Sequence, residues 1–170
     1  MSMYVPRQRQ APESRGRVIG AVRELLQEGA FHESTVEQVA ARAGVSRATV
    51  YQQFGSRVGL VDAICESLDL SAVKGTDDVD TFLERCVAFW AAEETLHAQL
   101  YGAAALDPAA REFVERQTRD RQAHIVKLAG KQALPLLLLL TSFETFIELR
   151  RRAGLSERQV VATLQRLAAA

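Results

Sequence analysis

The sequence predicts an all-α protein of about nine helices. Apolar residues recur at spacings of three and four along the 170 residues, and no stretch alternates as a strand does. Ser, Thr or Asp precedes most of these apolar segments and Gly often follows them, as N-caps and C-terminal stops do. These two patterns together favour helices joined by short turns throughout the chain.

The composition fits a globular protein in a reducing compartment. Hydrophobic residues make up 48% of the chain, and the only cysteines are Cys65 and Cys86. Two cysteines do not make a disulfide framework, so we expect both to be small core residues. The first ten residues contain no apolar stretch, which excludes a secretory signal there. A cytoplasmic location is therefore expected.

Four helices are predicted in the N-terminal part, each bounded by a capping residue and a stop. The predicted ranges are 14–28, 34–44, 46–54 and 56–68. The second helix begins at Ser34 or at Thr35, because Ser34 stands three residues before Glu37 and Thr35 three before Gln38, and either pair forms a capping box. The fourth helix is expected to face inward through four apolar side chains, namely Leu60, Val61, Ile64 and Leu68.

Five further helices are predicted after a polar break around Gly75. They begin near Asp78, Leu96, Asp107, Pro135 and Ser156. Gly130 is expected to end the helix that starts at Asp107, and Gly154 the helix that starts near Pro135 and runs to about Arg152. The Asp107-Pro108 pair combines an N-cap with proline at the first helical position.

The zero net charge conceals an asymmetry. Residues 1–60 hold eight arginines and five acidic residues, a net +3, and residues 61–170 hold 13 basic and 16 acidic residues, a net −3. A basic end is a weak indication of nucleic-acid binding, and surface scatter explains it equally well.

Residues 35–60 carry the most informative pattern, two short helices separated by Ala43-Gly44-Val45-Ser46. Gly44 supplies the positive φ that ends the first helix, Val45 is the apolar residue of the turn, and Ser46 caps the second helix. This is the spacing of a helix-turn-helix, which presents the first turn of its second helix to the DNA major groove. The alternative is a plain helical hairpin without DNA.

The same stretch closely resembles the DNA-binding region of the tetracycline-repressor-like (TetR) transcriptional regulators. The matching positions are Thr35-Val36, Val39-Ala40, Ala43-Gly44-Val45-Ser46, Ala48-Thr49-Val50-Tyr51, Phe54, Ser56-Arg57 and Leu60, with Ile19, Ala21, Leu25, Gly29 and Phe31 upstream. The resemblance covers about residues 15–60, and the remainder agrees only in length and helical character. It implies a homodimeric repressor with a DNA-binding domain at 1–56 and a ligand-binding and dimerisation domain at 57–170.

The resemblance also implies a DNA-contacting set. It comprises Thr35, Ser46, Arg47, Ala48, Thr49, Tyr51, Gln52, Gln53 and Arg57. Arg47 and Thr49 match positions that reach bases or nearby phosphates, and the Tyr51 hydroxyl matches a phosphate contact, although its ring could instead only pack on the first helix. Arg57 stands where the family usually has lysine, a phosphate contact. Gln53 and Val58 depart from the family pattern, and whether an N-terminal arm with Arg7 and Arg9 touches DNA or is a solvated tail stays open.

The C-terminal part contains an uninterrupted apolar run over residues 134–140, far shorter than the roughly 20 residues needed to cross a membrane. A helix that is apolar all round needs cover on every side. We therefore expect helices near 133–152 and 156–168 to pair with those of a second copy in a four-helix dimer interface, as in the family. Full burial within one subunit is the alternative.

A small, mostly apolar effector is the expected ligand of the C-terminal helices. The candidate contacts are Phe89, Trp90, Glu93, His97, Tyr101, His124, Phe143 and Phe146. His97 and His124 lack a matched cysteine or carboxylate spacing, so neither a metal site nor another cofactor is expected. No motif with catalytic mechanics is present, which argues against an enzyme. The alternative function is a helical ligand-binding or partner-binding protein that uses the helix-turn-helix only as a scaffold.

Overall fold

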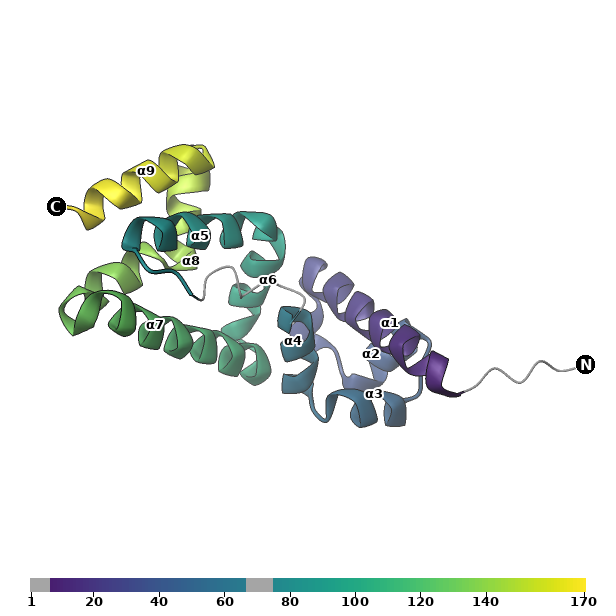
Figure 1. Ribbon diagram of the computed structural model, residues 1–170. Helices are drawn as coiled ribbons and strands as arrows, with labels where there is room; N and C mark the ends of the chain where they lie inside the picture. The colour runs from purple at the N-terminus through teal and green to yellow at the C-terminus, as the bar shows by residue number, and fades with distance from the viewer. Residues whose placement is uncertain (1–6, 67–74) are drawn as a thin grey trace, which may run out of the picture. The chain divides into compact units, whose positions relative to one another are not determined.

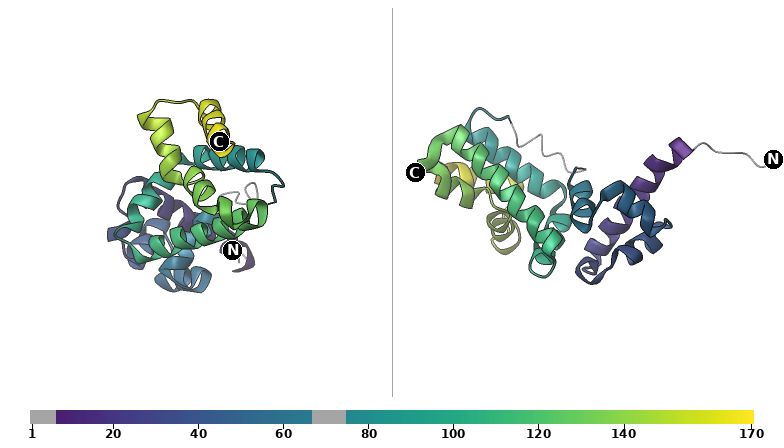
Figure 2. Two further views of the ribbon diagram at one scale, coloured as in Figure 1. Left: turned by 90° about the vertical axis from the view of Figure 1, so that its left-hand side faces the viewer. Right: turned by 90° about the horizontal axis from the view of Figure 1, so that it is seen from below.

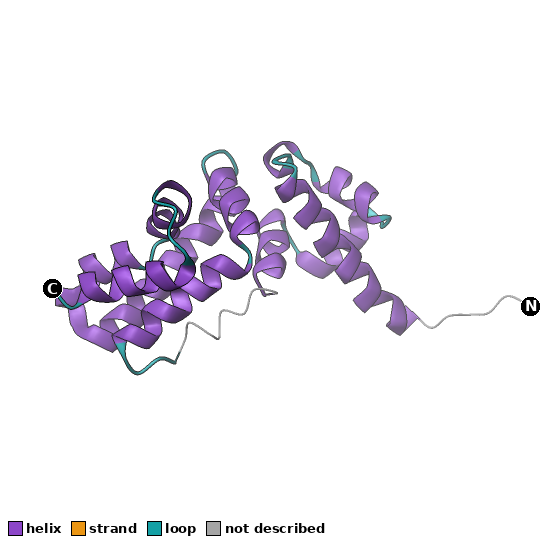
Figure 3. Ribbon diagram, turned by 90° about the horizontal axis from the view of Figure 1, so that it is seen from above, coloured by secondary structure: helices purple, strands orange, loops and turns teal. Residues whose placement is uncertain are grey.

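The computed structural model describes residues 7–66 and 75–170, and within them every regular element is helical (Figures 1 and 3). The nine α-helices are α1 (Arg7–Gln27), α2 (Val36–Ala43), α3 (Arg47–Phe54), α4 (Arg57–Glu66), α5 (Val79–Ala92), α6 (Glu94–Ala104), α7 (Pro108–Leu140), α8 (Phe143–Ile147) and α9 (Glu157–Ala168). Two short turns accompany them, a 3-10 turn η1 (Phe31–Glu33) and a π-helical turn η3 (Glu148–Arg152). The all-α prediction is confirmed.

The chain divides into two compact units, and neither is contiguous in sequence. The first comprises Met1–Ser67 and Ala98–Phe113, and the second Leu68–His97 and Val114–Ala170. The division therefore does not fall between residues 56 and 57 as expected. The reason is that α4 packs against α1 and α3 and so belongs to the same unit as they do.

The first unit is built on α1, which packs against α2 and α4, while α3 packs against α2 and α4 (Figure 1). The side chains at its centre are fully or almost fully buried, namely Val18, Val22, Leu26, Val39, Val50, Leu60, Val61 and Ile64. This core fixes the orientation of α3 on its neighbours. Leu68, the fourth apolar residue predicted for α4, lies outside the described residues.

Helix α1 begins well before the predicted cap. It starts at Arg7 and continues past Pro12, so Ser14 lies inside the helix rather than at its N-terminus. Ser14 is buried, and its hydroxyl accepts a hydrogen bond of 2.7 Å from the Gln53 side chain of α3. The prediction of a cap at Ser14 is wrong because this hydroxyl has a tertiary partner. Residues 1–6 of the predicted N-terminal arm lie outside the described residues.

The boundaries of α2 and α3 follow the predicted caps. Thr35 and Gln38 form the capping box of α2, which decides between the two predicted starts. Gly44 ends α2 in the left-handed region, with φ of 63°. The Ser46 hydroxyl accepts a hydrogen bond from the Thr49 backbone and caps α3. The helix-turn-helix is thus set by local hydrogen bonds that the sequence alone reveals.

The second unit centres on α5, which packs against α8 and α9 (Figure 2). Phe82 and Cys86 of α5 meet Ile125 and Leu137 of α7 in a buried core. Burial raises the pKa of the Cys86 thiol to about 12, so this cysteine is a protonated core residue, as predicted, and not a nucleophile. The side chain of Cys65 is not among those described.

Helix α7 contains a break at Gly130, whose φ of 81° and ψ of 169° are not helical. The predicted stop at Gly130 is therefore present as a kink. The predicted single helix from Pro135 to Arg152 is wrong, because the chain turns at Thr141 and Ser142 and the Ser142 hydroxyl caps α8 by accepting from the Thr145 backbone at 3.1 Å.

By length and composition alone, α7 is apolar enough to cross a membrane. The non-helical Gly130 interrupts that stretch and leaves residues 131–140 beyond it. Ten residues are about half of the roughly 20 that a spanning helix needs, and a backbone break in lipid leaves polar groups without partners. We therefore interpret the apolar end of α7 as a protein-packing segment.

Candidate functional site

Helix α3 presents one exposed face. Val50 and Phe54 are buried and anchor α3 to its unit, whereas Arg47, Ala48 and Tyr51 are exposed. Gln52 extends the same exposed face. Residues at these spacings share one side of a helix, so the four side chains form a single outward surface that starts at the Ser46 cap.

A small polar cluster covers this surface. The Arg47 guanidinium pairs with the Glu37 carboxylate of α2 at 2.7 Å and lies 5.2 Å from the centre of the Tyr51 ring. Hydrogen bonding to Tyr51, reinforced by the charge of Glu37, raises the pKa of Arg47 above its ordinary value. Both members of the ion pair are more than half exposed, and exposed pairs contribute little stability. A phosphate can therefore replace Glu37 at small energetic cost.

Two helix N-termini lie beside this surface, each marked by a hydroxyl residue. The Thr35 hydroxyl accepts from the Gln38 backbone at 3.2 Å and the Ser46 hydroxyl from Thr49 at 3.1 Å. The hydroxyls of Ser46 and Thr49 also bond each other at 2.8 Å. Helix N-termini attract anions through their unpaired backbone amides and their dipole, so the N-termini of α2 and α3 are suited to anions.

Two residues of the predicted DNA-contacting set point inward instead. The Gln53 amide donates to Ser14, and its backbone carbonyl accepts from Arg15. The Arg57 guanidinium donates to acceptors within its own unit. Tertiary partners far along the chain hold both side chains, and DNA contact by these two residues stays a prediction.

The Arg57 guanidinium is the centre of a part-buried network (the Arg57 network). Its Nε donates to Asp107 Oδ2 at 2.7 Å, and its terminal nitrogens donate to the backbone carbonyls of Phe31 and Ser34. The guanidinium also lies 4.1 Å from the centre of the Phe31 ring. Asp107 is only 3% exposed, and its other oxygen accepts from two backbone amides at the start of α7. The Asp107 carboxylate therefore caps α7 and also neutralises the charge of Arg57 in α4.

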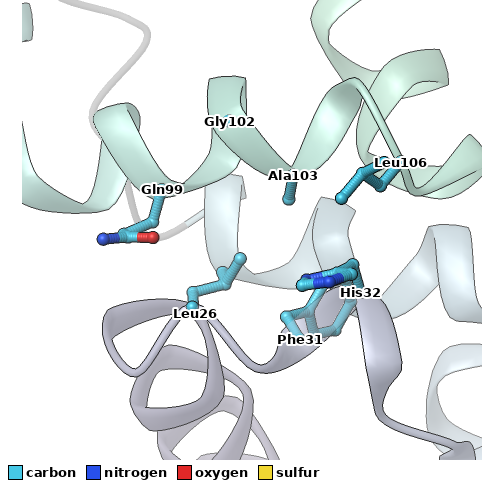
Figure 4. A pocket seen from close by; sticks show the side chains of 8 residues that line it. Leu26, Phe31, His32, Gln99, Gly102, Ala103 and Leu106 are labelled. Carbon is cyan, nitrogen blue, oxygen red and sulfur yellow. The ribbon is translucent and has the colours of Figure 1, made fainter.

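A small pocket lies within the first unit, between the end of α1 and α6 (Figure 4). It measures about 130 Å³, and Leu26, Phe31 and His32 line it on the side opposite Ala103. Ligand pockets usually measure about 300–1,000 Å³. The pocket is too small for a drug-sized effector.

The second unit gathers five of the predicted effector contacts into one cluster (the aromatic cluster). Its members are Phe89, Trp90, His97, Phe143 and Phe146. The Trp90 and His97 rings meet edge to face, with centroids 4.8 Å apart and an interplanar angle of 83°. The Trp90 indole donates to the Thr141 carbonyl at 3.1 Å, a bond that the sequence did not predict. The break between α7 and α8 supplies that acceptor.

The remaining predicted effector contacts lie elsewhere or at the margin. The His124 ring packs at a tilt against Phe82 and its Nε2 is 2.9 Å from the Thr76 hydroxyl, so His124 belongs to a different part of the second unit. Burial, followed by the charge of Lys127, lowers the pKa of His124. Tyr101 belongs to the first compact unit, and Glu93 ends α5 and acts on His97 through its charge.

Acid is expected to destabilise the protein through His97. Burial lowers its pKa in the folded state to about 4, against 6.5 for an exposed histidine. Between pH 6.5 and 4, His97 is therefore protonated in the unfolded chain but not in the folded chain. The free energy of unfolding falls as the pH falls through this range, by up to about 3 kcal/mol. Urea unfolding followed by circular dichroism at several pH values measures this loss. The His97→Phe variant should lose less over the same range, and an identical loss in both proteins would contradict the assignment.

Among the residues described, no three His, Cys, Asp or Glu side chains group as metal ligands would. The two surfaces built from the predicted site residues are the exposed face of α3 in one unit and the aromatic cluster in the other.

Comparison with known proteins bears on the first of these surfaces. A family model described as "Bacterial regulatory proteins, tetR family" matches residues 18–64. The match runs from within α1 to within α4 and includes the whole helix-turn-helix. No curated protein sequence matches the chain.

Proposed function

From the match of residues 18–64, which identifies this chain as a transcriptional regulator of the tetR type, we propose its mode of action. The protein is a homodimeric repressor that binds a palindromic operator and is released from it by a small, mostly apolar ligand. The exposed face of α3, with Arg47, Tyr51 and Gln52 directed outward from a capped N-terminus, is the observation that carries the DNA-binding part. A regulator of this kind works where the DNA is, so we expect a cytoplasmic location.

The proposed DNA contacts follow from exposure. Arg47, Ala48 and Thr49 enter the major groove first, because they form the opening turn of α3. Tyr51 and Gln52 extend the same face, and the N-termini of α2 and α3 at Thr35 and Ser46 meet phosphates. Each phosphate contact adds salt sensitivity but no sequence information.

Dimerisation through the second unit is supported by apolar side chains that remain exposed in the single chain. Leu136 and Leu139 of α7 are 43% and 61% exposed, and Leu167 of α9 is 49% exposed. These are the segments for which the apolar run predicted a partner surface. Burial against a second copy removes this apolar area from water, which favours association.

Release follows from linkage between ligand and DNA. Two recognition helices must fit half-sites roughly 34–36 Å apart, or a related spacing, at the same time. A ligand that prefers a dimer with another spacing lowers DNA affinity by the same factor as DNA lowers ligand affinity. Helix α6 carries His97 of the aromatic cluster and continues into residues 98–104 of the first unit. We propose that this continuous helix transmits the change.

Selection from random oligonucleotides at low salt tests the proposal. We expect an enriched inverted repeat, which reports both sequence recognition and a symmetric dimer. Arg47→Ala and Thr49→Ala should relax discrimination at particular bases by about 1–3 kcal/mol each, whereas Tyr51→Phe should weaken all sequences alike. Arg119→Ala, an exposed change on α7, is the matched control and should behave as wild type. Absence of any enriched sequence would refute the proposal, and an enriched site without symmetry would refute the dimer.

A further inference from the structure

His97 places a polar ring among aromatic side chains. Its side chain is 2% exposed, and the rings of Phe89 and Trp90 lie with centroids 4.8 Å from it, with Phe143 at 5.9 Å. These residues come from α5, α6 and α8, so three helices enclose the imidazole. An enclosed polar ring needs hydrogen-bond partners for its nitrogens.

Only one nitrogen of this imidazole is satisfied. The backbone carbonyl of Phe89 accepts a hydrogen bond from the ring, whereas Nε2 has no partner among the described residues. The bond to a carbonyl places the proton on Nδ1 and leaves Nε2 as a bare acceptor. Because burial lowers the pKa of His97 to about 4, the ring stays neutral near pH 7 and Nε2 remains an acceptor. A buried acceptor without a donor is unfavourable and rare in folded proteins.

We propose that Nε2 of His97 is the recognition atom of the effector site, and that it accepts a hydrogen bond from the hydroxyl of a neutral aromatic ligand of the phenol class. The inference rests on the proposed function, in which a small ligand releases DNA. Trp90 packs edge to face against both His97 and Phe143, so the surroundings of Nε2 are aromatic, and aromatic rings prefer such edge-to-face neighbours. The ligand thereby supplies the donor that the protein lacks.

The charged groups near His97 indicate that the ligand is neutral. The Glu93 carboxylate acts on His97 through its charge, which disfavours an anion at the ring. Arg121 is a cation that would favour an anionic ligand, because its Nε also lacks a partner among the described residues. Its Nη1, however, donates to the Thr141 carbonyl at 3.0 Å, the same carbonyl that accepts from Trp90. Arg121 is thus already engaged in holding the cluster.

The test compares phenol with toluene, which has nearly the same shape but no donor, and with benzoate, which is an anion. Trp90 is the only tryptophan of the chain, so its fluorescence reports binding at the cluster directly. We expect wild-type protein to bind phenol about tenfold more tightly than toluene, and benzoate not at all. The 15N resonance of His97 Nε2 should shift on addition of phenol but not of toluene.

Two variants locate the effect. His97→Phe keeps the ring and removes the acceptor, so its preference for phenol should vanish. His32→Phe, in the small pocket of the first unit, should retain the preference. Equal affinity for phenol and toluene, no binding of either, tighter binding of benzoate, or a preference lost with His32→Phe would each overturn the inference.

Addition of the same compounds to the operator complex tests recognition by His97 and release of DNA by a small ligand as two separate properties. If phenol and toluene bind equally and both release DNA, release by a small ligand is supported and the role of His97 is refuted. If phenol binds with the expected preference and the DNA complex persists, the role of His97 is supported and release by this ligand is refuted.

Discussion

Replacing Asp107 with alanine is expected to lower the free energy of unfolding by about 3 kcal/mol or more. The Arg57 guanidinium would lose its counter-charge in a part-buried site, and α7 would lose the carboxylate that accepts from Ala109 and Ala110. Loss of a helix cap alone costs about 1 kcal/mol, so the larger part of the effect comes from the stranded charge. Urea unfolding followed by circular dichroism measures the difference.

Asp78 provides the matched control, because its carboxylate caps α5 by accepting from the Thr81 backbone at 2.8 Å and it is exposed. Asp78→Ala should lose only about 1 kcal/mol. The Asp107→Leu/Arg57→Met double variant should lose less than the two single variants together, since no charge is left unpaired. If Asp107→Ala were no more destabilising than Asp78→Ala, the Arg57 network would contribute nothing beyond a cap.

Gly59→Ala is expected to weaken operator binding by about tenfold or more, with a loss of stability of roughly 1–3 kcal/mol. A Cβ on Gly59 would overlap the carbonyl oxygen of Phe54, the last residue of α3. The obstacle is backbone rather than a flexible side chain, so α3 must move relative to α4. The exposed face of α3 would then be displaced from the groove. A titration of labelled operator with the variant measures the effect.

Gly20→Ala is the matched control for this substitution, since a Cβ at Gly20 of α1 meets nothing within 4 Å. There the change should stabilise the helix by about 0.5–1 kcal/mol and leave operator affinity unaltered. Wild-type affinity in Gly59→Ala would show that the recognition helix tolerates movement at its C-terminal end.

The sequence predicted the helix-turn-helix well because its determinants are local. Thr35, Gly44 and Ser46 set the ends of α2 and α3 through hydrogen bonds and backbone angles that span four residues or fewer. Ser14 shows the limit of the same reasoning, since a hydroxyl that looks like a cap is buried against a residue 39 positions away. A capping pattern does not reveal whether a tertiary partner competes for the side chain.

The functional residues that the sequence missed depend on long-range packing. The sequence did not reveal the Asp107 partner of Arg57, because the two residues are 50 positions apart. Gly59 carried no signal of its own, because the carbonyl that it approaches belongs to the preceding helix. In the second unit, Phe89, Trp90 and His97 are close in sequence and lie together in the structure, whereas only the fold separates His124 from them. Ligand contact by these residues stays a prediction.

The discontinuous make-up of the first unit limits how it can be inherited or transplanted. Residues 98–113 belong to it, including Asp107, although they follow a segment of the second unit in the sequence. A fragment that ends at residue 66 would contain the full helix-turn-helix but leave Arg57 without its carboxylate. Exchange of DNA-reading segments between regulators of this build, by recombination or by engineering, therefore has to carry two stretches of the gene rather than one.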